Sequence, residues 1–183
     1  MSDESTERAS KMKFDKHQIM AMIAFLGFAL SFIVHILTYF GVDLLTPFPV
    51  LWGLHIGIFI VFIPMVLSNR QHFGQRQNMK ILFAPIPQWP RVLVGVLFVY
   101  AIINFTIFFF LSKGGTPAIE DGRYVLQNHG QFIRALTADE FHWQHVYIAR
   151  GFSGHWLLFY IIPALNFWFP RPIEEGEKSE GVV

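Results

Sequence analysis

The chain of 183 residues is long enough for one compact domain, and 53% of its residues are hydrophobic, more than the roughly 45–50% of soluble proteins. Its net charge is +1 and its basic residues form no stripe, so we expect no nucleic acid partner. The absence of cysteine excludes disulfides, thiolate metal sites and a thiol nucleophile. With 21 Phe and 5 Trp, the composition predicts a protein embedded in a lipid bilayer.

The N-terminal part predicts a tail followed by a first membrane span. Residues 1–17 combine basic and acidic residues with Ser and Thr and cannot bury a core, so we expect a disordered cytoplasmic tail. Residues 19–40 form an uncharged run of 22 residues. At about 1.5 Å per residue this run can cross a hydrocarbon core of about 30 Å.

Two further uncharged runs predict the second span at 51–68 and the third at 92–111. In the second span Gly53 and Gly57 are four residues apart, a spacing that allows close helix approach. The basic loop at 69–91 contains several prolines near its end, which predicts a non-helical segment there. Asn104 is the one strongly polar residue of the third span, and we expect an interhelical hydrogen bond from it, with a ligand contact as the alternative.

Residues 113–151 predict a small folded cap outside the membrane. Two short apolar runs flank Asn128-His-Gly130, which is typical of a hairpin turn. Thr137 and Glu140 have the spacing of a capping box, so a helix is expected from near Ala138 to about Arg150.

A fourth span is predicted at 152–169, kinked at Pro163, and an acidic cytoplasmic tail at 171–183. The predicted fold is therefore an all-α membrane protein. It has a bundle of four transmembrane helices within residues 18–170, together with an extracytoplasmic hairpin-plus-helix cap.

The distribution of basic residues predicts the orientation of this bundle. Ten Lys and Arg residues lie on the side of both termini and the 69–91 loop, and four lie on the side of the cap. Because the more basic side is normally cytoplasmic, we expect both termini in the cytoplasm and a location in a bacterial inner membrane.

Three histidines lie at a similar predicted depth. By helix rise, His35, His55 and His155 lie about 4–8 Å inside the same, extracytoplasmic boundary. Ionisable residues within spans are costly and so indicate function, and imidazole binds haem iron, Cu and Zn. Two of the three could hold a haem b, and all three with His142 or His145 could hold Cu or Zn. The alternative is a structural role, through hydrogen bonds between helices or contact with interfacial water.

No motif with a diagnostic spacing decides between these roles. His-Glu-x-x-His and Cys-x-x-Cys-His are absent, and Ser153 and His155, two residues apart, point to different faces of a helix. No predicted span contains an acidic residue, which argues against a proton-driven transporter.

Two functions follow as hypotheses. The first is a non-enzymatic accessory or assembly subunit of a larger membrane complex, with the bilayer and other membrane protein subunits as its partners. The second is a haem- or metal-binding membrane redox protein that uses His35, His55 and His155, with help from His142 and His145.

Overall fold

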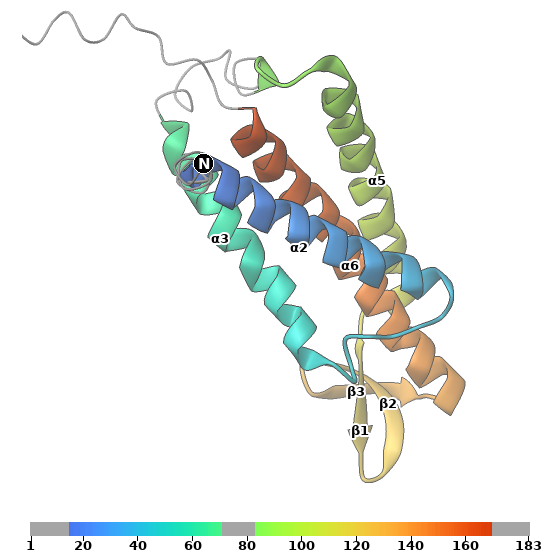
Figure 1. Cartoon of the computed structure of the whole chain (residues 1–183). Helices are drawn as coiled ribbons and strands as arrows, with labels where there is room; N and C mark the ends of the chain where they lie inside the picture. Colours follow the sequence, from blue (N-terminus) through green and yellow to red (C-terminus); the bar gives the residue numbers. More distant parts are fainter. Residues whose placement is uncertain (1–14, 71–82, 170–183) are drawn as a thin grey trace, which may run out of the picture.

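The computed structural model describes residues 15–70 and 83–169, so most of both predicted tails lies outside the described residues. The described chain is mostly helical (Figure 1). Its helices are α2 (Lys16–Tyr39), a 3-10 turn η1 (Pro49–Trp52) leading into α3 (Gly53–Ser68), α5 (Gln88–Ser112) and α6 (Ala138–Trp168). Between α5 and α6 lie the strands β1 (Thr116–Glu120), β2 (Arg123–Asn128) and β3 (Gln131–Ala135).

In the part of the chain that the structure describes, three segments are long and apolar enough to cross a membrane: α2, the unit of η1 and α3, and α5. They coincide with the first three predicted spans, and they indicate an integral membrane protein. Large hydrophobic side chains are exposed all along these helices. Such surfaces are compatible with direct contact to lipid.

Helix α6 is the central element of the bundle. It packs against α2, α3 and α5, and in Figure 1 it lies behind α2 and between α3 and α5. Trp156 and Tyr160 of α6 belong to a core cluster with α2 and α3, while Leu158 and Ile161 join a cluster with α5. The helix is thus enclosed on several sides, and polar side chains on it can be shielded by its neighbours.

The start of α6 confirms the predicted capping box. The Thr137 hydroxyl accepts a hydrogen bond from the Glu140 amide at 3.1 Å, and a Glu140 carboxylate oxygen accepts one from the Thr137 amide at 2.9 Å. The predicted end near Arg150 is wrong, because the helix continues without interruption to Trp168. Its glycines serve close packing instead: a Cβ atom at Gly151 would lie 2.6 Å from the Phe108 ring.

The cap contains a sheet of three antiparallel strands in the order β1-β2-β3. The predicted hairpin corresponds to β2 and β3, joined by a turn in which His129 and Gly130 have positive φ angles of 49° and 80°. Strand β1 extends the predicted hairpin to a third strand. Pro117 is tolerated there because β1 is an edge strand, where a missing N–H leaves no gap in the ladder.

Helix α5 begins at Gln88, four residues before the predicted third span. The prediction that prolines exclude helix up to residue 90 is therefore wrong. Pro87 precedes the helix as its N-cap, and Pro90 lies in the first turn, where an N–H would have no intrahelical partner.

Candidate functional site

His35 lies at the centre of a polar network in which α2, α5 and α6 meet. Its side chain is buried. Its Nδ1 atom lies 2.9 Å from the Ser153 hydroxyl of α6, and its Nε2 atom is hydrogen-bonded to the Tyr100 hydroxyl of α5. Both ring nitrogens are therefore occupied by partners from other helices.

The direction of these hydrogen bonds follows from the single hydrogen of the Ser153 hydroxyl. Ser153 donates to the Ala149 carbonyl at 2.6 Å, so it must accept from Nδ1–H of His35. The Nε2 atom of His35 then accepts from Tyr100, whose oxygen in turn accepts from the Tyr39 hydroxyl at 2.7 Å. A metal at His35 would have to displace one of these two hydroxyls.

Arg150 extends the network to the C-terminal end of α2. Its Nη2 donates to the Thr38 carbonyl at 2.7 Å, and its guanidinium lies 4.5 Å from the centroid of the Tyr39 ring. The Thr38 carbonyl also accepts a hydrogen bond from the Gly41 amide at 3.2 Å, so Arg150 supplies a further donor at this helix end and adds a cation–π contact.

Asn104 makes the interhelical contact expected of it. Its amide nitrogen donates to the Arg150 carbonyl at 3.0 Å and to the Gly151 carbonyl at 3.3 Å. This arrangement confirms the interhelical hydrogen bond and leaves the alternative, a ligand contact, without support.

His55 of α3 and His155 of α6 form a second histidine site. Their ring centroids are 5.9 Å apart and the rings are almost perpendicular, at 87°. Trp156 donates its indole N–H to Nδ1 of His55 at 3.0 Å, so the hydrogen of that imidazole is on Nε2. His155 uses Nδ1–H to donate to the Gly151 carbonyl at 3.2 Å, so its Nε2 carries a lone pair.

The two Nε2 atoms are the open hydrogen-bonding positions of this pair. Within residues 15–70 and 83–169 neither atom has a protein partner. One is a donor, on His55, and the other is an acceptor, on His155.

Two apolar hollows meet at His155. The larger, of about 580 Å³, lies between α5 and α6, and the smaller, of about 260 Å³, lies between α3 and α6. Both are lined by His155 and Phe159, so these residues form the ridge between them. We call the two hollows together the lateral groove.

A haem held between His55 and His155 does not fit this arrangement. A macrocycle ligated by both rings would lie in the plane midway between them. Phe152 lies 5.8 Å from the His55 centroid and 5.6 Å from that of His155, and Trp156 lies 6.2 and 6.5 Å away. Both aromatic rings are nearly equidistant from the two imidazoles and so occupy that plane.

His142 and His145 lie apart from this pair, near the start of α6, and contact the loop after α2. His142 Nε2 donates to the Gly41 carbonyl at 2.8 Å, and His145 Nδ1 lies 3.0 Å from the Thr46 hydroxyl. Burial lowers the pKa of His145, an effect that the nearby Asp43 carboxylate opposes. The contacts fasten the loop to α6.

The structure brings together two of the five histidines selected from the sequence, His55 and His155. Among the residues described, no group of three or more His, Cys, Asp or Glu side chains is placed to hold a metal ion. A metal at the pair would need further ligands from beyond the residues described.

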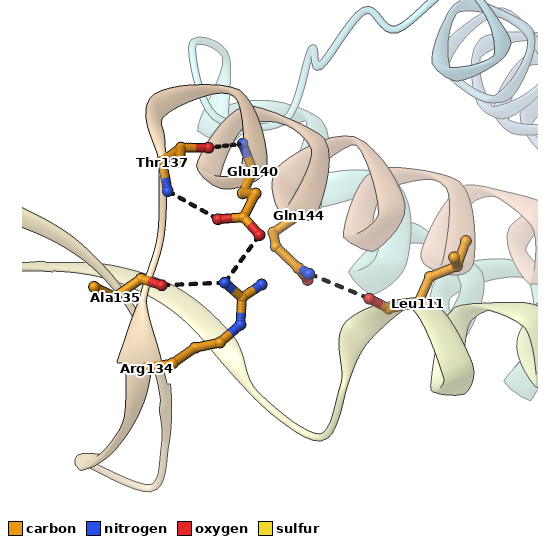
Figure 2. A network of polar contacts seen from close by, with 6 residues as sticks. All are labelled: Leu111, Arg134, Ala135, Thr137, Glu140 and Gln144. Atoms are coloured by element: carbon orange, nitrogen blue, oxygen red, sulfur yellow. Dashed lines mark hydrogen bonds and ion pairs between the residues drawn. The ribbon is translucent and has the colours of Figure 1, made fainter.

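A separate polar network joins the sheet to α6 and α5 (Figure 2). Arg134 of β3 forms an ion pair with Glu140 at 2.9 Å, and Gln144 donates to the Leu111 carbonyl at 3.2 Å. The hydrogen bond from the Thr137 amide, helped by Arg134, lowers the pKa of Glu140. This network fixes the cap to the bundle.

Comparisons with protein-family models, with curated proteins and with solved structures find no match to this chain. Function must be inferred from the site itself.

Several residues of the two histidine sites were not selected from the sequence. Tyr39 and Tyr100 lie within predicted spans, and a phenol at such a position is the signal that could have drawn attention to them. Ser153 was weighed only as a partner of His155, whereas its partner is His35, 118 residues away in the sequence.

Proposed function

We propose that the protein is an accessory or assembly subunit of a larger membrane complex, built on four membrane spans. The fourth span, residues 152–169, consists of the second half of α6 and its C-cap residue Phe169. It runs beside α2, α3 and α5 and shares their core clusters. Its polar residues are explained by its central position, since a helix enclosed by neighbours does not have to be apolar on every side.

The observation that carries the proposal is the contrast between the interior and the surface of the bundle. Inside, the polar groups of His35, Tyr100, Ser153, Asn104 and Arg150 bond mainly to one another or to the backbone. Outside, α5 exposes a series of large side chains that do not line the lateral groove: Val92, Val96, Val99, Ile103 and Phe110. Such a surface provides contact area for neighbouring subunits, and the interior network provides rigidity rather than chemistry.

The proposed orientation places the cap outside the cytoplasm of a bacterial inner membrane, as the basic residues indicate. In that orientation His55 and His155 lie in the half of the bilayer that faces the cap.

The test is extraction of the native membrane in a mild detergent, followed by native electrophoresis and mass spectrometry. We expect the 21.2 kDa chain to migrate in a larger assembly with a fixed set of proteins in constant ratio. Chemical crosslinks should connect the cap or α5 to the same partners. Migration as a lone chain in several mild detergents, with no recurrent crosslinked partner, would contradict an accessory role.

A second candidate, a metal-binding redox protein, is favoured by one observation, the open lone pair on Nε2 of His155. His55 could join it as a ligand only by giving up the hydrogen bond from Trp156. Because haem does not fit between the two rings, the redox role would require a Cu ion; a Zn ion has no redox chemistry and would leave a metal-binding role alone. Elemental analysis and an oxidised-minus-reduced optical spectrum of gently purified protein test it. A colourless protein without stoichiometric metal would rule it out.

A further inference from the structure

We propose that the larger hollow of the lateral groove binds the ring of a membrane-soluble quinol or related phenol, held by a hydrogen bond to Nε2 of His155. The inference goes beyond the accessory role and does not depend on it, because it concerns a ligand that enters from the lipid rather than a protein partner.

The polar requirement of the ligand follows from His155, the one polar side chain among the residues that line the larger hollow. The Nε2 lone pair of His155 needs a donor. A phenolic hydroxyl supplies that donor. A polar group without a hydrogen-bond partner in an apolar site costs free energy. A ligand that forms the missing hydrogen bond removes this cost, which favours its binding.

The apolar requirement follows from the walls of the groove. The larger hollow is lined by rings and aliphatic chains of α5 and α6, among them Phe98, Ile102, Phe105 and Phe159. Its volume of about 580 Å³ falls within the range of small-molecule sites, roughly 300–1,000 Å³. Its aromatic lining favours a flat ring, through edge-to-face or offset contacts.

The position of the groove favours a ligand with a hydrocarbon tail. Ile102 and Phe105 line it and are also largely exposed on the outside of the bundle, at 54% and 44%. The groove is therefore open sideways, towards lipid rather than water. A tail can remain among the acyl chains while the ring reaches His155.

The test uses the full chain in phosphatidylcholine nanodiscs and a tritium-labelled benzoquinol with a ten-carbon tail, kept reduced under nitrogen. Empty nanodiscs give the background from partitioning into lipid. The matched ligand is the dimethyl ether of the same quinol, which has the same ring and tail but no hydroxyl hydrogen. We expect saturable binding of the quinol at one site per chain and binding of the ether at least about tenfold weaker.

Two variants test the assignment to this groove. His155→Phe keeps an aromatic ring but removes the acceptor, and it should weaken quinol binding about tenfold while leaving binding of the ether unchanged. Ile102→Trp fills the larger hollow and should abolish binding of both ligands. The control is Ile103→Trp on the same helix. Ile103 is equally exposed, at 53%, but does not line the hollow, so this variant should bind both ligands like the unaltered protein.

The proposal is overturned by the absence of saturable binding to the unaltered protein, or by equal binding of quinol and ether, which would mark a groove for hydrocarbon chains. Equal binding by the Ile102→Trp and Ile103→Trp variants would place the ligand elsewhere. Stoichiometric Cu or Zn that is lost in His155→Phe would assign the pair to a metal instead. None of these outcomes bears on whether the chain belongs to a larger complex.

Discussion

The ring of Tyr160 lies directly against the backbone of Gly27, in the space that a side chain at position 27 would occupy. The hydroxyl of the same tyrosine donates to the Leu54 carbonyl at 2.7 Å. Tyr160 therefore links α6 to α2 through its ring and to α3 through its hydroxyl. Three helices meet on one side chain.

Gly27→Ala is expected to destabilise the bundle. The added methyl group would overlap the Tyr160 ring, and overpacking of this kind costs about 1–3 kcal/mol. The control is Gly95→Ala in α5, where a Cβ atom would meet no neighbour within 4 Å. Thermal unfolding in detergent should show a lower midpoint for the first variant and an unchanged or slightly higher one for the second. Equal midpoints would show that the two helices can separate at Gly27 without cost.

Ser153→Ala is expected to weaken the His35 network. The Nδ1–H group of His35 would lose its acceptor, and a buried donor without a partner costs about 1–3 kcal/mol. Thr106→Ala provides the control, since Thr106 also donates to the carbonyl four residues earlier, at 2.8 Å, but bonds no second side chain. Unfolding free energies should differ between the two variants by at least about 1 kcal/mol. An equal loss of unfolding free energy in both variants would mean that the hydrogen bond between Ser153 and His35 does not contribute to stability.

The cap junction is expected to weaken in acid because of Glu140. Its pKa is lowered in the folded protein from the usual 4.5, chiefly by the hydrogen bond from the Thr137 amide. The stabilisation is therefore complete above pH 4.5 and is lost as the pH falls from there through the folded-state pKa. Unfolding midpoints measured from pH 6 to pH 3 should fall more steeply for the unaltered protein than for Glu140→Gln, which cannot titrate. Parallel curves would assign the acid sensitivity to other groups.

His145 is expected to titrate below its usual pKa of 6.5, because burial disfavours the charged imidazole. Its contribution to stability is complete above pH 6.5 and decreases as the pH falls towards the lower folded-state pKa. NMR titration of the imidazole in labelled protein measures the value directly. Asp43→Asn should lower it further by removing the opposing carboxylate, whereas Asp121→Asn, in the turn between β1 and β2, should leave it unchanged. A rise in Asp43→Asn would contradict the contribution assigned to that carboxylate.

The topology can be tested with reporters. A cytoplasmic reporter fused after Val183 should be active, and an extracytoplasmic reporter inserted after Gly122, in the turn between β1 and β2, should also be active. If both positions report the same side, α6 does not cross the membrane and the four-span proposal fails.

The sequence was most informative for the long uncharged runs, in which the backbone N–H and C=O groups must form hydrogen bonds within the same segment. The runs at 19–40, 51–68 and 92–111 each correspond to a helix, because lipid leaves the backbone no other partner. The capping box of Thr137 and Glu140 could also be predicted from the sequence, because both of its hydrogen bonds join residues that are three positions apart. Such local chemistry does not depend on the tertiary structure.

The candidate site was less predictable because it depends on how the helices are rotated about their axes. A similar depth of His35, His55 and His155 was read from helix rise, but only the rotation decides that His55 faces His155 while His35 faces Tyr100. The predicted helix end near Arg150 was wrong for a similar reason, since a glycine such as Gly151 can end a helix or make room for a neighbouring ring such as that of Phe108. Contacts between distant helices resolve both questions.

The uninterrupted course of α6 gives the protein a mechanical property. About 25 Å of one stiff rod connect Ala138, at the sheet, with His155, in the lateral groove. The ion pair of Arg134 and Glu140 clamps the sheet to one end of this rod. The sheet therefore cannot be displaced relative to His155 without bending this helix, so the cap and the lateral groove are expected to move together.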